Sequence, residues 1–262
     1  MLNVKLDFNT VGDSVTDDTD ALQNALDALK DGGELFFPAG IYRTTACLIF
    51  YSNQHLIFEE GAVLLRGNKD LEQRYILANH TTPGKGGYSS CENVLIDGAC
   101  FDGNAQIELC TTLLNTCHAK NITIRNCLFR NGCLWHYIEI NSSKNVLVDA
   151  CTFDSSYSTD SEKGEQVQLD LARTGSYGPI MDNSGKEVEF MPDETVCRDI
   201  EIKNCRFYGY GHAPAIGNHA NAPHHHVKIH HNTFIGSFGR RGAIDFVDMM
   251  TDIEAFDNEY GD

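Results

Sequence analysis

The sequence contains one pair of side chains well suited to moving a proton, Asp170 and His219. Asp170 ends the alternating segment 167–170, and His219 ends a second such segment, 216–219. If these segments stack as neighbouring strands, their backbones lie about 4.8 Å apart, and the carboxylate and imidazole come within hydrogen-bond reach. A positioned carboxylate and a histidine are typical general acid and base groups, so we predict this pair as the centre of a catalytic site.

Other polar residues are predicted to share the outward face with this pair. Glu165 and Asp245 complete the set of catalytic candidates. The substrate-binding candidates are Glu139, Asn141, Gln168, Arg173, Tyr177 and Arg241. Asp170 and Asp245 would be two coils apart, about 9.6 Å along the stack, close to the carboxylate separation that an inverting hydrolase requires. In a lyase, the histidine or a tyrosine would instead remove the proton α to a uronate while a cation neutralises the acid group.

No dedicated metal site is predicted, although the run from Pro223 to His226 is rich in histidine. Strand alternation places His224 and His226 on one side and His225 on the other, which is a poor ligand set. Ca²⁺ held by carboxylates is the one cofactor left open, because it would neutralise a uronate as Arg173 would.

A nine-residue phrase that recurs six times indicates how these side chains are positioned. Its copies begin at Asn93, Asn121, Asn145, Asp199, His226 and Asp252, at intervals of 28, 24, 54, 27 and 26 residues. Apolar and polar residues alternate within the copies, which indicates strands, and a repeat of about 20–50 residues is typical of solenoids. No helical pattern lies between copies, so the sequence predicts a parallel β-helix. The interval of 54 is then two ordinary turns or one turn with a long insertion.

The pattern also aligns a second strand upstream of each phrase. Its inward positions are Leu114, Ile138, Val167, Ile216 and Ile244. The outward residues one position later are Asn115, Glu139, Gln168, Gly217 and Asp245, and those three positions later are Cys117, Asn141, Asp170, His219 and Val247. Within the phrase, the ninth position is aromatic, and the seventh becomes Cys127, Cys151, Cys205, Asn232 and Asn258. We interpret these cysteines as packing residues, because equivalent cysteines in one column cannot all pair as disulfides.

The charge composition of the chain argues against two classes of binding partner. The chain has 37 acidic against 20 basic residues and a formal net charge of −17, which argues against nucleic acid or an anionic membrane as a partner. No apolar run approaches the length of a membrane span, and the start of the sequence has no signal-peptide pattern. We therefore expect a cytoplasmic or phage-associated protein, or one whose signal lies outside the given sequence.

The N-terminal segment is predicted to cap the stack of coils. Val4 to Phe8 alternates like a strand, and residues 21–29 carry apolar side chains at helical spacing, with Asp17 as the N-cap. No cap is visible at the far end, so further coils or a second copy, as in a trimer, would cover it. The predicted organisation is a single β-helix domain, 1–262, with a cap at 1–45, coils at 46–262 and a loop insertion at about 154–197 that forms one wall of a groove.

The N-terminal sequence resembles the opening of the pectate lyase superfamily, whose N-terminal module is shared with family 28 glycoside hydrolases and phage tailspike depolymerases. The resemblance rests on residues 7–43, with G-D-x-x-x-D-D-T before the helix and L-F-F-P-A-G-x-Y after it. It implies a right-handed parallel β-helix that acts on, or binds, a polysaccharide in a groove along one sheet. It does not fix the chemistry, because lyases, hydrolases, epimerases and non-catalytic adhesins share this scaffold. The N-T-D and G-H-G signatures of polygalacturonases are absent, which argues against ordinary pectin hydrolysis.

We therefore predict an all-β protein, a right-handed parallel β-helix with an N-terminal capping α-helix. Its expected activity is cleavage of a polysaccharide that contains uronic acids, by β-elimination or by glycoside hydrolysis. The alternative is a non-catalytic glycan-binding module of the adhesin or tail-fibre kind, in which the same groove holds the polysaccharide without cutting it.

Overall fold

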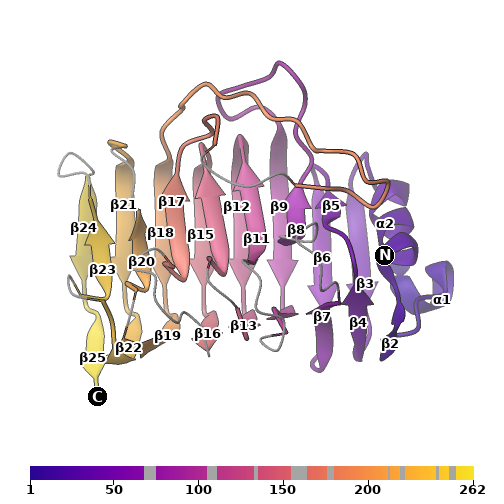
Figure 1. Cartoon of the computed structure of the whole chain (residues 1–262), viewed down its shortest axis with the longest axis horizontal. Helices are drawn as coiled ribbons and strands as arrows, with labels where there is room; N and C mark the ends of the chain where they lie inside the picture. Colours follow the sequence, from indigo (N-terminus) through magenta and orange to yellow (C-terminus); the bar gives the residue numbers. More distant parts are fainter. Residues whose placement is uncertain are drawn as a thin grey trace.

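The structure is a computed structural model that describes residues 1–67, 75–104, 111–132, 135–154, 164–175, 180–211, 213–218, 222–239, 242–247 and 252–262. Within these residues the strands form three parallel sheets, named sheets A, B and C, of nine, nine and seven strands. The chain passes from one sheet to the next in every coil, and the coils stack along one axis (Figure 1). The right-handed parallel β-helix predicted from the sequence is confirmed.

The strands of each sheet follow one another in chain order. Sheet A consists of β1 (Leu2–Asn3), β3 (Gly33–Phe37), β6 (Gln54–Phe58), β9 (Cys91–Asp97), β12 (Ala119–Arg125), β15 (Lys144–Asp149), β18 (Arg198–Lys203), β21 (His225–His230) and β24 (Ile253–Phe256). Sheet B consists of β2 (Asp13–Asp17), β4 (Gly40–Thr44), β7 (Ala62–Arg66), β10 (Cys100–Asp102), β13 (Leu128–Arg130), β16 (Thr152–Asp154), β19 (Arg206–Tyr210), β22 (Thr233–Ser237) and β25 (Glu259–Gly261). Sheet C consists of β5 (Leu48–Phe50), β8 (Tyr75–Asn79), β11 (Thr112–Cys117), β14 (Ile138–Asn141), β17 (Val167–Asp170), β20 (Ile216–Asn218) and β23 (Ile244–Phe246).

The repeated phrase forms the strands of sheet A, and its asparagines occupy the corners. Asn121 and Asn145, at the first position, have φ of 55° and 52°, and Asn126 and Asn204, at the sixth, both have φ of 55°. Asparagine tolerates this left-handed region better than other residues with a side chain beyond Cβ. The first and sixth positions of the phrase therefore mark the residues at which the strands of sheet A bend and end.

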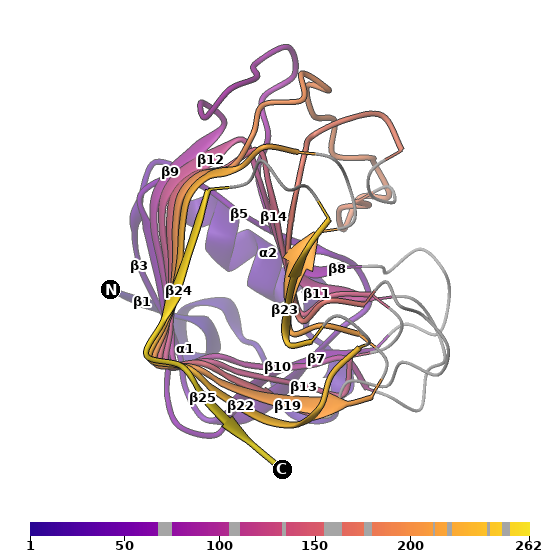
Figure 2. The same ribbon diagram turned by 90° about the vertical axis from the view of Figure 1, so that its left-hand side faces the viewer.

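The interior is built from columns of equivalent side chains, enclosed by the three sheets with A and C on opposite sides (Figure 2). The ninth position of the phrase gives a column of stacked rings in sheet B whose centroids are 4.5–5.2 Å apart. This aromatic column comprises Phe101, Phe129, Phe153, Phe207, Phe234 and Tyr260. The spacing matches that of paired strands, about 4.8 Å, so the backbone stacking places each ring against the next.

The cysteine column is packing, as predicted. Cys127, Cys151 and Cys205 are each at most 2% exposed, and the Cys151 N–H donates to Cys205 Sγ at 3.4 Å. Burial raises the pKa of the Cys151 and Cys205 thiols. The eight cysteines among the described residues are all free thiols.

Helix α2 (Thr19–Ala28) covers the N-terminal end of the stack, where Leu22, Ala25 and Leu26 are fully buried. Two local predictions were wrong. Val4–Phe8 is a short helix, α1, because the Asn3 side chain accepts hydrogen bonds from the N–H groups of Lys5 and Leu6. The N-cap position of α2 is held by Asp18 rather than the preceding aspartate, and its carboxylate bonds the N–H groups of residues 11 and 12 instead of the helix.

The interval of 54 residues is one turn that carries a long insertion, because β15 pairs directly with β18. β17 is the regular sheet C strand of this turn. The inserted chain that follows it includes residues 180–197, which we call the strap. The strap runs back along one edge of the stack to α2, where Asn183 Nδ2 donates to Asp20 Oδ1 at 3.0 Å (Figure 1, orange segment). On the way, Ile180 and Val188 pack against the outer side of β5 and β8.

Candidate functional site

The outer side of sheet C brings together most of the described site candidates. Glu139 pairs with Gln168, and Asn141 pairs with Asp170, on the neighbouring strands β14 and β17. Gln168 pairs in turn with Gly217, and Gly217 pairs with Asp245. The outward columns predicted from the sequence are therefore confirmed wherever the structure describes them.

These outward side chains are nevertheless buried. Glu139 and Glu165 are 2% exposed, Asp170 and Gln168 are 1% exposed, and Asn141 is fully buried. This burial could not be predicted from the sequence, because strand alternation distinguishes inward from outward positions but does not show what covers the outer side. A buried carboxylate must be protonated, paired or hydrogen-bonded, so the partners of each carboxylate decide its chemistry.

Glu139 is held as an acid that keeps its proton at neutral pH. Burial, and secondly the negative charge of Asp170, raise the pKa of Glu139 to about 8, although hydrogen bonding from Asn115, Asn141 and Thr112 acts in the opposite direction. Asn115 Nδ2 donates to Glu139 Oε2 at 3.2 Å. Two neighbouring carboxyls in surroundings that separate their protonation are typical of acid/base pairs.

Three donors surround the Asp170 carboxylate. The Leu171 N–H donates to Asp170 Oδ1 at 2.7 Å, and Gln168 Nε2 donates to Oδ2 at 3.3 Å. Arg173 Nη2 lies 3.8 Å from Oδ1, and the Arg173 side chain is 36% exposed. Arg173 therefore connects this buried carboxylate to the protein surface.

Glu165 and Asp245 lie on either side of Gly217. A Cβ on Gly217 would lie 2.0 Å from the backbone oxygen of Asp245 and 3.5 Å from Glu165 Cγ, so only glycine fits this close approach. Asp245 itself is partly exposed on β23. His136 Nδ1 is 3.6 Å from Glu165 Oε2 and within 2.8 Å of the Glu165 carbonyl oxygen.

From the sequence, His136 was missed, and Asn115 was placed in the outward column without being named as a site residue. His136 precedes the inward residue Ile138 by two positions, as Glu165 precedes Val167, and this equal spacing was the available signal. Three predicted residues, His219, Tyr177 and Arg241, lie outside the described residues. The pairing of Asp170 with His219 therefore stays a prediction.

The strap is fixed to the coils by His118, whose side chain is fully buried. His118 Nδ1 lies 2.8 Å from the Gly87 carbonyl oxygen, and Nε2 lies 2.6 Å from the Met191 carbonyl oxygen. Carbonyl oxygens only accept, and a neutral imidazole has a single N–H, so both bonds require the protonated ring. Asp193 of the strap, with Oδ1 3.9 Å from Nδ1, supplies the opposite charge.

His118→Asn is expected to loosen the strap. Asparagine accepts the left-handed backbone at this position, φ 54°, but it is too short to join both carbonyls. Loss of two charge-assisted hydrogen bonds, about 1.5–3 kcal/mol each, should speed amide hydrogen exchange across residues 180–197 by at least about tenfold. His55→Asn, an exposed histidine on sheet A, is the matched control and should leave strap exchange unchanged.

Within the described residues, no group of three or more histidine, cysteine, aspartate or glutamate side chains is placed to hold a metal ion. Neither helix in the described part of the chain is long and apolar enough to cross a membrane. The described part of the site thus consists of carboxyls, amides, His136 and Arg173 on the outer side of sheet C.

These features define a right-handed parallel β-helix protein with a buried polar layer outside one sheet. The chain belongs to the rhamnogalacturonase A/epimerase, pectate lyase-like family, whose model matches residues 1–236. The resemblance seen in the N-terminal sequence is confirmed.

Two curated proteins to which the chain is similar have names that describe different functions. The chain is 31% identical over 171 residues to plasmin and fibronectin-binding protein A of Streptococcus pneumoniae, a match that covers 58% of this chain and 24% of that protein. It is 44% identical over 64 residues to a mannuronan C5-epimerase of Azotobacter vinelandii, covering 21% of this chain and 6% of the epimerase. The chain thus spans no more than about a quarter of the length of these relatives.

Solved structures confirm the fold. The structure of a surface adhesin of Streptococcus pneumoniae superposes with a TM-score of 0.79 at 23% identity, covering 99% of this chain and 62% of that chain. A family 28 exopolygalacturonase of Yersinia enterocolitica superposes with a TM-score of 0.74 at 17% identity, covering 99% of this chain and 53% of that chain. At these identities the likeness shows the fold alone.

Proposed function

We propose that this chain is a polysaccharide-recognition module that holds its ligand along the outer side of sheet C without cleaving it. The burial of Glu139, Asp170 and Glu165, each at most 2% exposed, carries this proposal. A catalytic carboxyl must reach the scissile bond or the proton that it transfers, and these three carboxyls are enclosed by the protein. They act as a polar layer that fixes the shape of the surface above them.

Two further observations support recognition. One curated relative of this chain is named a plasmin and fibronectin-binding protein, and the solved adhesin shares the fold over 99% of this chain. Arg173 reaches from the buried Asp170 toward solvent, so it presents a cation at the surface that suits a uronate or another acidic sugar. The acidic net charge of the chain makes such a local cation necessary for an acidic ligand.

Arg173→Ala is expected to weaken binding of an acidic polysaccharide by about tenfold, the effect of losing roughly 1.4 kcal/mol of charge-assisted contact. Affinity electrophoresis in gels that contain polygalacturonate or alginate measures the loss. Arg125→Ala is the matched control, because Arg125 lies on sheet A and pairs with Asp97 at 2.8 Å on an exposed face. This control should retain wild-type mobility in the same gels.

The pair formed by Glu139 and Asp170 favours a second candidate, an enzyme that cleaves a uronic-acid polysaccharide. A protonated carboxyl beside a second carboxyl on the next coil is the arrangement that hydrolysis requires, and His219 would serve as base in an elimination. For this activity the outer side of sheet C would have to open when substrate binds.

One assay separates the two candidates. Polygalacturonate and alginate are each incubated with the protein, with and without Ca²⁺. Binding, the unsaturated product and the reducing ends are followed in the same samples. Binding without either product supports the recognition module. Product that is lost in Asp170→Asn overturns it in favour of the enzyme, with the unsaturated product indicating a lyase and reducing ends alone indicating a hydrolase. Absence of binding and of product would contradict both candidates.

A further inference from the structure

A hollow of about 430 Å³ lies on the outer face of sheet A. Sheet A is on the side of the coil opposite to sheet C (Figure 2). Its walls come from four successive coils, through strands β15, β18, β21 and β24. Leu147 lines it at the position where the next three coils carry the long side chains of Glu201, Lys228 and Glu254. The hollow therefore lies where this column of outward side chains changes from a shorter apolar residue to longer charged residues.

A ladder of asparagines ends at one rim of the hollow, where Asn145 is its last asparagine. Each amide donates to the side-chain oxygen of the preceding asparagine at 2.8–3.0 Å, through Asn53, Asn93, Asn121 and Asn145. The next residue of the ladder is Asp199, whose carboxylate has no proton to donate. Among the described residues, Asn145 Oδ1 receives no hydrogen bond of this series, so the rim presents an acceptor to a ligand.

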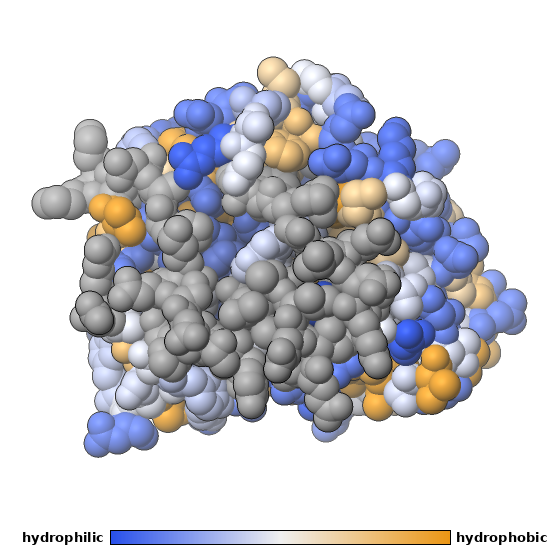
Figure 3. All heavy atoms as spheres, in the orientation of Figure 1, coloured by the Kyte–Doolittle hydropathy of each residue, from blue (hydrophilic) through white to orange (hydrophobic). Residues whose placement is uncertain are grey.

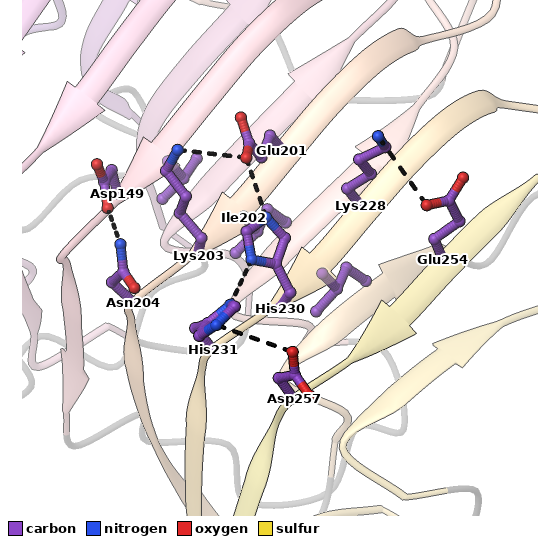
Figure 4. A network of polar contacts seen from close by, with 12 residues as sticks. Asp149, Glu201, Ile202, Lys203, Asn204, Lys228, His230, His231, Glu254 and Asp257 are labelled. Carbon is purple, nitrogen blue, oxygen red and sulfur yellow. Dashed lines mark hydrogen bonds and ion pairs between the residues drawn. The ribbon is translucent and has the colours of Figure 1, made fainter.

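Glu201 is fixed in the floor of the hollow. Glu201 Oε1 accepts hydrogen bonds from His230 Nε2 at 2.9 Å and from Lys203 Nζ at 3.2 Å (Figure 4). Burial opposes ionisation of Glu201, but these two bonds outweigh it and lower the pKa of the carboxyl. No described side chain donates a hydrogen bond to the second oxygen, Oε2, which is therefore available to a ligand. Lys228 Nζ, 3.9 Å from Glu254 Oε2, adds a donor beside it.

An aromatic ring lies on the same face. Phe256 follows Glu254 by two residues in β24, and its ring is stacked on the His230 ring with centroids 4.7 Å apart and an interplanar angle of 5°. Phe256 is 42% exposed. The stack fixes the orientation of the ring and leaves part of its surface for a ligand.

We propose that this hollow is a second binding site, for a neutral oligosaccharide, and that it functions independently of the outer side of sheet C. Sugar hydroxyls both donate and accept, which suits the acceptors Asn145 Oδ1 and Glu201 Oε2 and the donor Lys228 Nζ. Phe256 does not line the hollow itself; its ring lies two residues beyond Glu254 on the same face, where it suits the apolar face of a further pyranose. The volume falls within the range of about 300–1,000 Å³ for small-ligand sites.

Charge argues against an acidic ligand in this hollow. The lining carries three carboxylates, Asp199, Glu201 and Glu254, against Lys228 and His226. Like charges brought together at an interface are unfavourable, so an acidic sugar chain is repelled. The two outer faces would thus select different glycans, an acidic one at sheet C and a neutral one at sheet A.

Leu147→Trp tests the proposal by filling the hollow. Titration calorimetry with cellohexaose, mannohexaose and xylohexaose as neutral probes should show at least about tenfold weaker binding to this variant than to the wild type. Thr123→Trp is the matched control, because Thr123 is the equivalent outward residue one coil earlier and does not line the hollow. The control, and Asp170→Asn on sheet C, should bind the neutral probes as the wild type does.

Glu201→Gln provides a second test that does not depend on the bulky substitution being tolerated. It removes the charge from the floor while keeping the shape, and we expect it to bind hexagalacturonate more readily than the wild-type hollow does. Neutral probes that fail to bind the wild type, or that bind Leu147→Trp with undiminished affinity, would overturn the proposal. Loss of acidic-glycan binding at sheet C would leave these results unaffected, so failure of one site is distinguishable from failure of the other.

Discussion

Glu139→Gln is expected to raise the free energy of unfolding by on the order of 5 kcal/mol at about pH 9 and by little at about pH 4. Burial, with the neighbouring charge of Asp170, raises the pKa of Glu139 from 4.5 to about 8. The folded state therefore holds this proton more tightly than the unfolded chain does. The stability contributed by the neutral carboxyl is fully present below pH 4.5 and is lost as the pH rises through about 8.

Glutamine is the appropriate replacement because it keeps an oxygen for the Asn115 amide and removes the titration. Urea unfolding between about pH 4 and pH 9 measures the effect. Asp170→Asn is the control that separates the effect of burial from the effect of the Asp170 charge. Without that charge the folded-state pKa of Glu139 is lower, so the pH-dependent loss of stability caused by Glu139 should be complete at a lower pH. Parallel profiles for the wild type and Glu139→Gln across the whole range would show that Glu139 does not carry a raised pKa.

The repeated phrase was sufficient to predict the coils, because the residue types at its fixed positions are required by the backbone conformation and by packing in the core. Asparagine recurs where φ is positive, as at Asn121 and Asn126, and an aromatic ring recurs where rings stack. Outside the repeat the same reasoning failed. Val4–Phe8 alternates like a strand, yet the Asn3 side chain caps its first N–H groups and makes it helical. Capping depends on a hydrogen bond from one neighbouring side chain, and the alternation of apolar and polar residues gives no information about such a bond.

The register of sheet C was also predictable, whereas the burial of its outer side was not. A slip of one residue would expose Leu114 and Ile138 and bury their polar neighbours, so the apolar column fixes the register. What covers an outward side chain depends on the course of loops, and no repeat specifies a loop. The strap is the example among the described residues: its attachment to His118 joins positions 73 residues apart.

Within the aromatic column, we expect the largest loss of stability when a ring in the middle of the column is removed, because such a ring contacts a neighbouring ring on each side. Phe153 stacks on Phe129 and Phe207 with centroids 5.1 Å and 4.5 Å apart, and it is fully buried. Phe153→Ala is expected to lower the free energy of unfolding by about 3–5 kcal/mol, as large-to-small changes in cores do. Chemical denaturation at a fixed pH measures this loss.

Tyr260→Ala is the matched control, because Tyr260 stacks on one ring only, Phe234, at the end of the same column and is 67% exposed. Its removal leaves no enclosed cavity, so its cost should be well below that of Phe153→Ala. Equal losses for the two variants would show that the column contributes through the area of each ring rather than through enclosure. In a solenoid each coil is stabilised mainly by its two neighbours. A cavity at Phe153 therefore weakens the contacts of the coil that carries Asp170 with the preceding coil, which carries Glu139, and with the following coil.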